Sequence, residues 1–234
     1  MTDGAPSTQE HAFDVLESLE RYNRWIVDHL HPYVGSRLLE VGAGTGNLTR
    51  FFLRCEEILA VDIDPSFLGE FGRRFAGYPR VKTEVMDVGA PADPLGERRF
   101  DSVLCVNVLE HIPDDQGTLK RFRNHLVPGG RLLLLVPAHA ALYGGVDRSA
   151  GHVRRYDRKG LAGKLVAAGF IVEKLRYFNM LGALGWWVNV RLLRRRYLPQ
   201  GQSRLLNLLV PLLRLEDRVS PPFGLSLIAV ATRR

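Results

Sequence analysis

Short apolar runs alternate with amphipathic stretches between residues 36 and 137. Apolar runs of four to seven residues bounded by turn residues are typical of buried strands, and the longer amphipathic stretches are typical of helices. The predicted strands are residues 38–41, 58–62, 80–85, 100–106 and 131–136, and the predicted helices are residues 48–54, 67–75 and 115–126. Repeated strand–helix alternation predicts an α/β fold with a parallel sheet covered by helices on both faces.

The flanking segments follow different patterns. Apolar residues recur at helical spacing from Gln9 to about His31, which predicts one or two helices. Residues 161–168 are expected to form a helix, and residues 170–178 and 225–231 form strands that we expect to pair antiparallel at one edge. Between these strands lie two leucine-rich stretches, the second of them interrupted by Pro211. The prediction is a single domain over 1–234, with an N-terminal helical cap (1–35), a core (36–178 and 221–234) and a helical insert (179–220).

Composition narrows the class of protein. The chain has 234 residues, 46% of them hydrophobic, which suffices for a substantial core. Cys55 and Cys105 lie in apolar surroundings without a metal-binding spacing, so we expect reduced, buried thiols. The N-terminus lacks the basic and apolar regions of a signal peptide, and no apolar run reaches about 18 residues. These features favour a cytoplasmic protein.

A glycine-rich turn follows the first strand, in the sequence E-V-G-A-G-T-G over residues 40–46. Glycines permit positive φ and close approach of a ligand to the backbone, and Thr45 or Asn47 is expected to cap the helix that follows. No Lys-Ser/Thr pair follows, as a P-loop would require, and Glu40 would repel a pyrophosphate. Asp62 ends the second strand, where acids accept hydrogen bonds from ribose hydroxyls. The turn therefore suits a cationic, phosphate-free nucleoside such as S-adenosylmethionine.

Several motifs together resemble those of class I S-adenosylmethionine-dependent methyltransferases. The match covers about residues 36–137 and includes the glycine turn, V-D-I-D-P (61–65), M-D-V (86–88), the fourth strand with E-H-I (110–112) and the L-V-P-G-G turn before the fifth strand. The resemblance implies a Rossmann-like sheet of seven mostly parallel strands whose last strand is antiparallel. It also implies S-adenosylmethionine as cofactor, with S-adenosylhomocysteine as product.

The cofactor residues expected from the turn and the resemblance lie at the carboxyl ends of the first four strands. They are Glu40, Gly42, Ala43, Gly44, Asp62, Ile63, Asp87, Val88 and Asn107. By resemblance, Asp62 accepts from the ribose, Ile63 lies beside the adenine and Asp87 accepts from the exocyclic amine. We expect no metal ligands.

Candidate catalytic residues are His111 and His152, because a neutral imidazole can accept a proton from an acceptor near neutral pH. For His111, packing against the adenine pocket is the alternative. His152 belongs to a long loop, residues 137–160, that contains G-H-V-R-R-Y, a run resembling a signature of bacterial small-molecule and glycan-associated methyltransferases. The arginines and tyrosine of this run bind an anionic substrate or fold the loop through structural hydrogen bonds.

Tyr22 and Trp25 either form a lid over the glycine turn or pack onto the domain. The expected substrate-binding residues are Tyr22, Trp25, Tyr143, Arg155 and Tyr156.

The expected reaction is methyl transfer to an O, N or C atom of a small, hydrophobic or secondary-metabolite acceptor. The alternatives are a macromolecule (protein or RNA) methyltransferase and an inactive cofactor-binding subunit. No N/D-P-P-Y-like tetrapeptide follows the fourth strand, and the arginines of residues 191–196 accompany leucines, so nucleic acid is not expected. The insert, apolar and base-flanked, covers the sheet, forms a homodimer contact, or contacts a lipid-linked substrate or a membrane surface.

Overall fold

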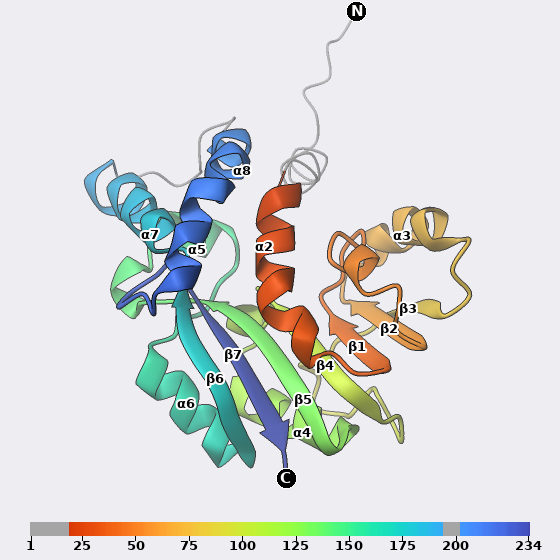
Figure 1. Ribbon diagram of the computed structural model, residues 1–234. Helices are drawn as coiled ribbons and strands as arrows, with labels where there is room; N and C mark the ends of the chain where they lie inside the picture. The colour runs from red at the N-terminus through yellow and green to blue at the C-terminus, as the bar shows by residue number, and fades with distance from the viewer. Residues whose placement is uncertain (1–18, 194–201) are drawn as a thin grey trace, which may run out of the picture.

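The computed structural model describes residues 19–193 and 202–234 of the chain, and its centre is a seven-stranded sheet (Figure 1). The sheet order is β3-β2-β1-β4-β5-β7-β6. β7 pairs antiparallel with both neighbours, β5 and β6. Figure 1 shows β7 running in the direction opposite to β6. The strands are β1 (Arg37–Val41), β2 (Glu57–Asp62), β3 (Val81–Val85), β4 (Phe100–Val106), β5 (Leu126–Pro137), β6 (Phe170–Phe178) and β7 (Ser226–Arg233). The predicted α/β fold, with a Rossmann-like sheet and one antiparallel last strand, is confirmed.

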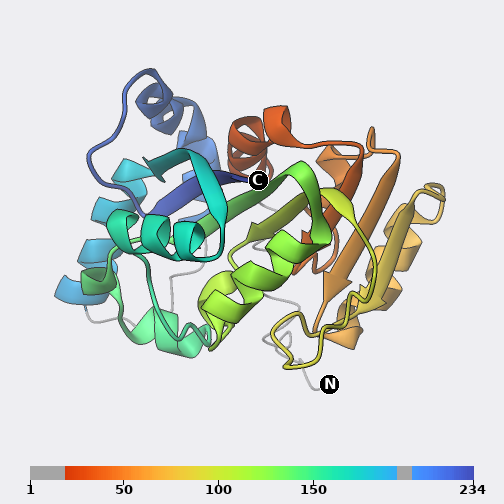
Figure 2. The same cartoon turned by 90° about the horizontal axis from the view of Figure 1, so that it is seen from below.

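Successive strand residues face opposite sides of the sheet, so each strand contributes to two cores. Leu39, Val103 and Leu134 face α4 (Asp115–His125) and α6 (Arg158–Ala167), which cover one face. The alternate residues face α2 (Glu20–Leu30) and α8 (Gln202–Leu213) on the other face, where α3 (Leu68–Phe75) covers β2 and β3. Figure 2 shows α4 and α6 together on one side of the sheet and α2 on the other.

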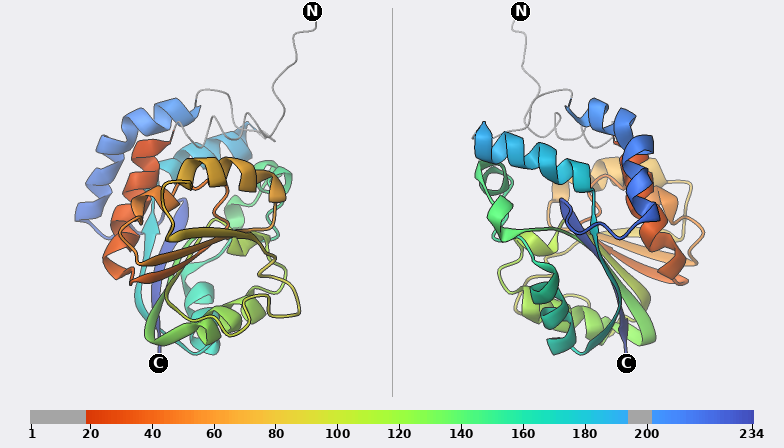
Figure 3. Two further views of the ribbon diagram at one scale, coloured as in Figure 1. Left: turned by 90° about the vertical axis from the view of Figure 1, so that its right-hand side faces the viewer. Right: turned by 60° about the vertical axis from the view of Figure 1, so that its left-hand side comes forward.

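The remaining helices are short and lie mostly at the carboxyl edge of the parallel strands. α7 (Met180–Trp187) crosses this edge beside α5 (Gly145–Ser149), as Figure 3 shows. Single 3₁₀ turns are η1 (His31–Tyr33), η2 (Thr49–Phe51), η3 (Pro65–Phe67), η4 (Leu109–His111), η5 (Ala140–Leu142) and η7 (Arg214–Arg218), and η6 (Val188–Leu192) is a π-helix.

Four local predictions are corrected. Residues 48–54 form only η2, because Asn47 accepts a hydrogen bond from Arg74 instead of capping a helix. Residues 137–160 contain η5 and α5 and are not an unstructured loop. Pro211 lies inside α8 without ending it. The two C-terminal strands do pair antiparallel, but β7 lies inside the sheet between β5 and β6, so only β6 forms the edge.

Other predictions are confirmed or lie outside the described residues. Cys55 and Cys105 are buried and unpaired, as expected. The predicted N-terminal helical region is present from Glu20 onward, and its part before residue 19 lies outside the described residues, as do Arg194, Arg195 and Arg196. None of the helices in residues 19–193 and 202–234 is long and apolar enough to cross a bilayer.

Candidate cofactor and acceptor site

The glycine turn after β1 has the conformation that its sequence requires. Gly42 and Gly44 have φ of 72° and 53°, in the left-handed region that favours glycine. A Cβ on Gly42 would lie 2.2 Å from Cγ2 of Val108, so this glycine allows the turns after β1 and β4 to touch. A Cβ on Gly44 would meet no atom within 4 Å, which leaves this side of the turn open to a ligand.

Asp62 connects this turn to the end of β2. Its Oδ2 accepts a hydrogen bond from the N–H of Gly44 over 2.8 Å, and its Oδ1 accepts from the N–H of Asp64 over 3.0 Å. Each carboxylate oxygen has a second lone pair, so Asp62 can accept from the hydroxyls of a ligand while it holds the turn. Ile63, the next residue, exposes 65% of its surface. The contacts of Asp62 thus fit the role that the resemblance implies.

Three further candidate residues lie at the same edge. Asp87 is exposed after β3, and its Oδ1 accepts from the N–H of Gly89 over 2.8 Å. Val88 is buried in the core beneath it. Asn107 ends β4 with φ of 54°, a conformation rare outside glycine that often marks functional positions. The strand ends therefore bring together the acids and the amide that sequence spacing predicts.

Glu40 and Ala43 are less accessible. Glu40 is 3% exposed, and its carboxylate accepts from the Thr49 hydroxyl over 2.7 Å. Burial raises the pKa of Glu40 to about 7, although the Thr49 hydrogen bond opposes this shift. Ala43 is buried, and its N–H donates to Val61. Both residues support the turn from below.

The donor set at this edge fits S-adenosylmethionine. Its side chains are the carboxylates of Asp62 and Asp87 and the amide of Asn107, beside the open backbone at Gly44. A sulfonium and an ammonium group are attracted by such carboxylates, whereas a phosphate would be repelled.

A second cluster lies just past β4, where Glu110, His111 and His152 meet. Potential ligand atoms of the three side chains all lie within 4.8 Å of one another. The imidazole rings of His111 and His152 are 4.7 Å apart at 83°. Glu110 is fully buried, and neither carboxylate oxygen has a hydrogen-bond partner. Burial raises the pKa of Glu110 to about 7 and lowers that of His111.

His152 is oriented by Asp147. Its Nδ1 lies 2.9 Å from Asp147 Oδ1, while its Nε2 lies 3.9 Å from Glu110 Oε1. The structure thus brings the two predicted catalytic histidines together. It also adds Glu110, which sequence reasoning did not select. The sequence did contain a signal for Glu110. It directly precedes the candidate His111 and follows a buried strand, so it was expected at the same carboxyl edge of the sheet.

The G-H-V-R-R-Y run folds the loop, and this corrects the expectation that Arg155 and Tyr156 bind substrate. Arg155 is 7% exposed, pairs with Asp147 at 2.7 Å, donates to the Ala138 carbonyl and lies over Trp186. Tyr156 is 3% exposed, and its hydroxyl lies 3.0 Å from Asp115. Both side chains have internal partners within the loop and the adjoining elements. Of the two interpretations left open, the structural one holds.

Tyr22 and Trp25 pack onto the domain, and the lid is not observed. Trp25 is fully buried, its ring centre lies 4.2 Å from that of Phe178 at an interplanar angle of 46°, and its Nε1 donates to Asp217. Burial raises the pKa of Tyr22 to about 12, and its hydroxyl accepts from Asn179. Trp25 is therefore corrected to a core residue and Tyr22 to a partly buried residue that packs against the core. Tyr143 is half-buried and donates to the carbonyl of His152, so it remains near the cluster.

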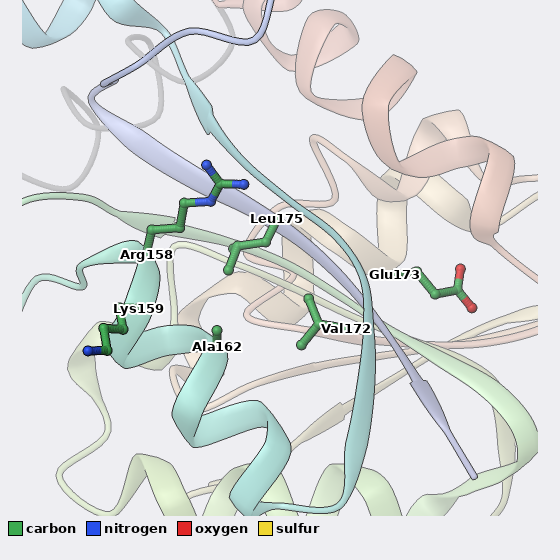
Figure 4. A pocket seen from close by; sticks show the side chains of 6 residues that line it. All are labelled: Arg158, Lys159, Ala162, Val172, Glu173 and Leu175. Atoms are coloured by element: carbon green, nitrogen blue, oxygen red, sulfur yellow. The ribbon is translucent and has the colours of Figure 1, made fainter.

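The depression in Figure 4 is a separate feature. It lies between α6 and β6 and is lined by Arg158, Lys159, Ala162, Val172, Glu173 and Leu175. Glu173 projects from the other side of the strand in this view. None of these residues belongs to the edge described above.

Sequence relatives point to the same chemistry. Residues 39–132 match the family model described as a methyltransferase domain. The squalestatin hexaketide synthase of Phoma sp. is 37% identical over 112 residues, which are 42% of this chain and 4% of the synthase. The polyketide synthase ThaQ of Burkholderia thailandensis is 31% identical over 136 residues, 49% of this chain and 6% of the synthase. The chain thus spans only a few per cent of the length of these relatives.

Solved structures share the fold at low identity. A methyltransferase from Mesorhizobium loti has a TM-score of 0.64 at 16% identity and covers 93% of this chain and all of its own. The N-methyltransferase NodS of Bradyrhizobium japonicum, solved with S-adenosylhomocysteine, has a TM-score of 0.55 at 15% identity and covers 99% of this chain and 89% of its own. The cyclase SpnF has a TM-score of 0.61 at 18% identity and covers 92% and 80%. Together, these findings show that residues 39–132 match a methyltransferase domain and that the chain has the fold of class I S-adenosylmethionine-dependent methyltransferases.

Proposed function

We propose that this protein transfers the methyl group of S-adenosylmethionine to a small, largely apolar acceptor of the secondary-metabolite type. The observation that carries the proposal is the position of the Glu110–His111–His152 cluster directly after β4, next to the turn that Gly42 joins to Val108. A polar, partly exposed cluster beside the cofactor edge provides a place for an acceptor's nucleophilic atom.

The division of labour follows from the chemistry of methyl transfer. The bound cofactor supplies the methyl group and its leaving group. Asp62, Ile63, Asp87 and the backbone at Gly44 would hold it. The protein must then align the acceptor atom and accept its proton where the nucleophile has one. We assign alignment to His111 and His152, with Asp147 fixing the ring of His152.

Two observations support an apolar acceptor. The relatives that share sequence with this chain are polyketide synthases, and α7 and α8 each expose several apolar side chains. On α7 the exposed side chains include Leu184 and Trp187, and on α8 they include Leu208 and Leu212. Exposed apolar patches of this kind mark binding sites in soluble proteins. These side chains would also suit a lipid-linked acceptor at a membrane surface, which would be a special case of this proposal. If they instead form a homodimer contact, they do not support an apolar acceptor.

The experiment is transfer of a labelled methyl group from S-adenosylmethionine to three kinds of acceptor: small polyketide-like compounds, total protein and total RNA. We expect label in the small apolar compounds, and much less label with Asp62→Ala enzyme at a limiting concentration of S-adenosylmethionine. Label only in protein or RNA would overturn the acceptor class. Cofactor binding without transfer to any acceptor would favour a binding subunit or other chemistry, as the name of the cyclase SpnF illustrates for this fold.

A further inference from the structure

We propose that Glu110, His111 and His152 bind a divalent transition-metal cation, and that this cation holds an oxygen atom of the acceptor. The second half of this statement rests on the proposed function, whereas cation binding itself does not. The proposal starts from the donor set, which is two imidazoles and one carboxylate whose ligand atoms lie within 4.8 Å of one another. Modest side-chain rotations bring such atoms to about 2.1 Å from a common ion.

The carboxylate of Glu110 is the strongest observation. The residue is fully buried, yet neither oxygen has a hydrogen-bond partner. A buried ionised group without a partner is costly, so proteins normally pair it or use it as a ligand. Asp147, the other buried acid here, is already compensated by Arg155 at 2.7 Å. Glu110 has no such compensation, and a bound cation would provide it.

The histidines have the outer partners that metal-binding imidazoles usually have. Asp147 lies 2.9 Å from Nδ1 of His152, which directs Nε2 of that ring toward Glu110. The Nδ1 of His111 is next to Gly151, and a hydrogen bond with the Gly151 backbone orients this ring. Such carboxylate or backbone contacts fix the tautomer of a metal-binding imidazole and leave the second nitrogen for the ion.

The chemistry of the donors selects the ion. Imidazole nitrogens favour Fe²⁺, Co²⁺ or Zn²⁺ over Mg²⁺ and Ca²⁺, which prefer oxygen ligands. His111 is exposed, so an ion can reach the cluster from solvent. Three protein ligands leave coordination positions open. An acceptor hydroxyl bound there would lose its proton to water more readily and become a better nucleophile.

The test is a titration of the untagged full chain with Co²⁺, followed by visible absorption, and with Zn²⁺, followed by calorimetry. We expect one ion per chain. Glu110→Gln keeps the size of the side chain, and His111→Asn alters an exposed residue that does not support the core. Since loss of an outer-shell partner already costs about 10–100-fold in affinity, each variant should weaken binding at least 10-fold.

His31→Asn is the matched control, because His31 is exposed and stacks on Phe52 outside the cluster. It should bind Co²⁺ as the parent does. Absence of Co²⁺ and Zn²⁺ binding by the parent chain would overturn the proposal, as would binding unchanged in both Glu110→Gln and His111→Asn. Should Glu110→Gln fail to fold, as judged by thermal melting, His111→Asn decides alone.

The methyl-transfer assay, run with and without a chelator, separates this inference from the proposed function. Transfer to a small acceptor that is lost with chelator and restored by Co²⁺ or Zn²⁺ supports both. Transfer unaffected by chelator overturns the role of the cation and leaves the proposed function, with a free imidazole as the base. Ion binding without transfer to any small acceptor overturns the proposed function and leaves the ion site.

Discussion

The carboxylate of Asp62 accepts a hydrogen bond from the backbone N–H of Gly44 across 2.8 Å. This contact joins the acid at the end of β2 to the open side of the glycine turn after β1. The same carboxylate therefore shapes the turn and remains available for the ribose hydroxyls of the cofactor.

Asp62→Ala should weaken binding of S-adenosylhomocysteine by at least about 10-fold. Two hydroxyls lose a charged acceptor, and each such hydrogen bond contributes about 1.5–3 kcal/mol. Isothermal titration calorimetry measures the effect. Asp64→Ala is the control, since its side chain accepts from the N–H of Ser66 on the surface and should leave affinity within about 3-fold. Equal affinity in Asp62→Ala and the parent would contradict the assigned cofactor position.

The contact between Gly42 and Val108 predicts a steric rescue. Gly42→Ala should destabilise the chain by about 2–4 kcal/mol, because the new methyl group overlaps the Val108 side chain and the positive φ is strained. Adding Val108→Ala should restore part of this loss, which thermal unfolding of the four proteins of the double-mutant cycle would show. Gly69→Ala, at a helical position with free space, should be neutral or slightly stabilising. Additive effects of Gly42→Ala and Val108→Ala would show that the two residues do not touch.

Glu40 predicts a pH dependence of stability in the absence of cofactor. Burial raises its folded pKa to about 7 from an ordinary value of 4.5. Between these values the folded state binds more protons than the unfolded state, so stability falls as pH rises from about 4.5 to 7, by roughly 3 kcal/mol. In Glu40→Gln the Glu40 part of this decrease should be absent, and the part from Glu110, whose pKa burial also raises to about 7, should remain. Exposed Glu97→Gln should keep both parts. Parallel pH profiles of Glu40→Gln and the parent in urea denaturation would refute the argument.

The apolar surface of α7 predicts a selective effect on the acceptor. Leu184→Ser and Trp187→Ser should raise the KM for an apolar acceptor about 10-fold or more, because burying one such side chain contributes about 1.5–3 kcal/mol. Binding of S-adenosylhomocysteine should not change. Val166→Ser, on the exposed side of α6, is the control and should change neither quantity. If KM stays constant and analytical ultracentrifugation shows a dimer that the variants dissociate, the surface is a subunit contact instead.

The strands could be predicted because burial on both faces leaves a nearly continuous apolar run. Residues 100–106 match β4 in full for this reason. Residues 170–178 also match β6, although this edge strand is only partly buried. The position of Asp62, Asp87 and Asn107 at one edge of the sheet could be predicted because the carboxyl ends of parallel strands lie together. The segment 48–54 could not be predicted in this way, because its caps depend on contacts with Arg74, which is distant in sequence.

Side-chain roles were harder to predict than positions. Arg155, Tyr156 and Trp25 have the chemistry of ligand-binding residues, but all three are buried and contact internal partners through an ion pair, a hydrogen bond and an aromatic contact. Sequence does not show whether a polar group has an internal partner. For the same reason the unpartnered carboxylate of Glu110 became visible only when its neighbours were known.

A crystal structure of the chain with S-adenosylhomocysteine tests the central claim most directly. We expect the ribose hydroxyls to donate to Asp62 and the adenine to lie between Ile63 and Asp87. The sulfur atom should face the cluster of Glu110, His111 and His152. A cofactor bound elsewhere, or a sulfur atom directed away from that cluster, would contradict it.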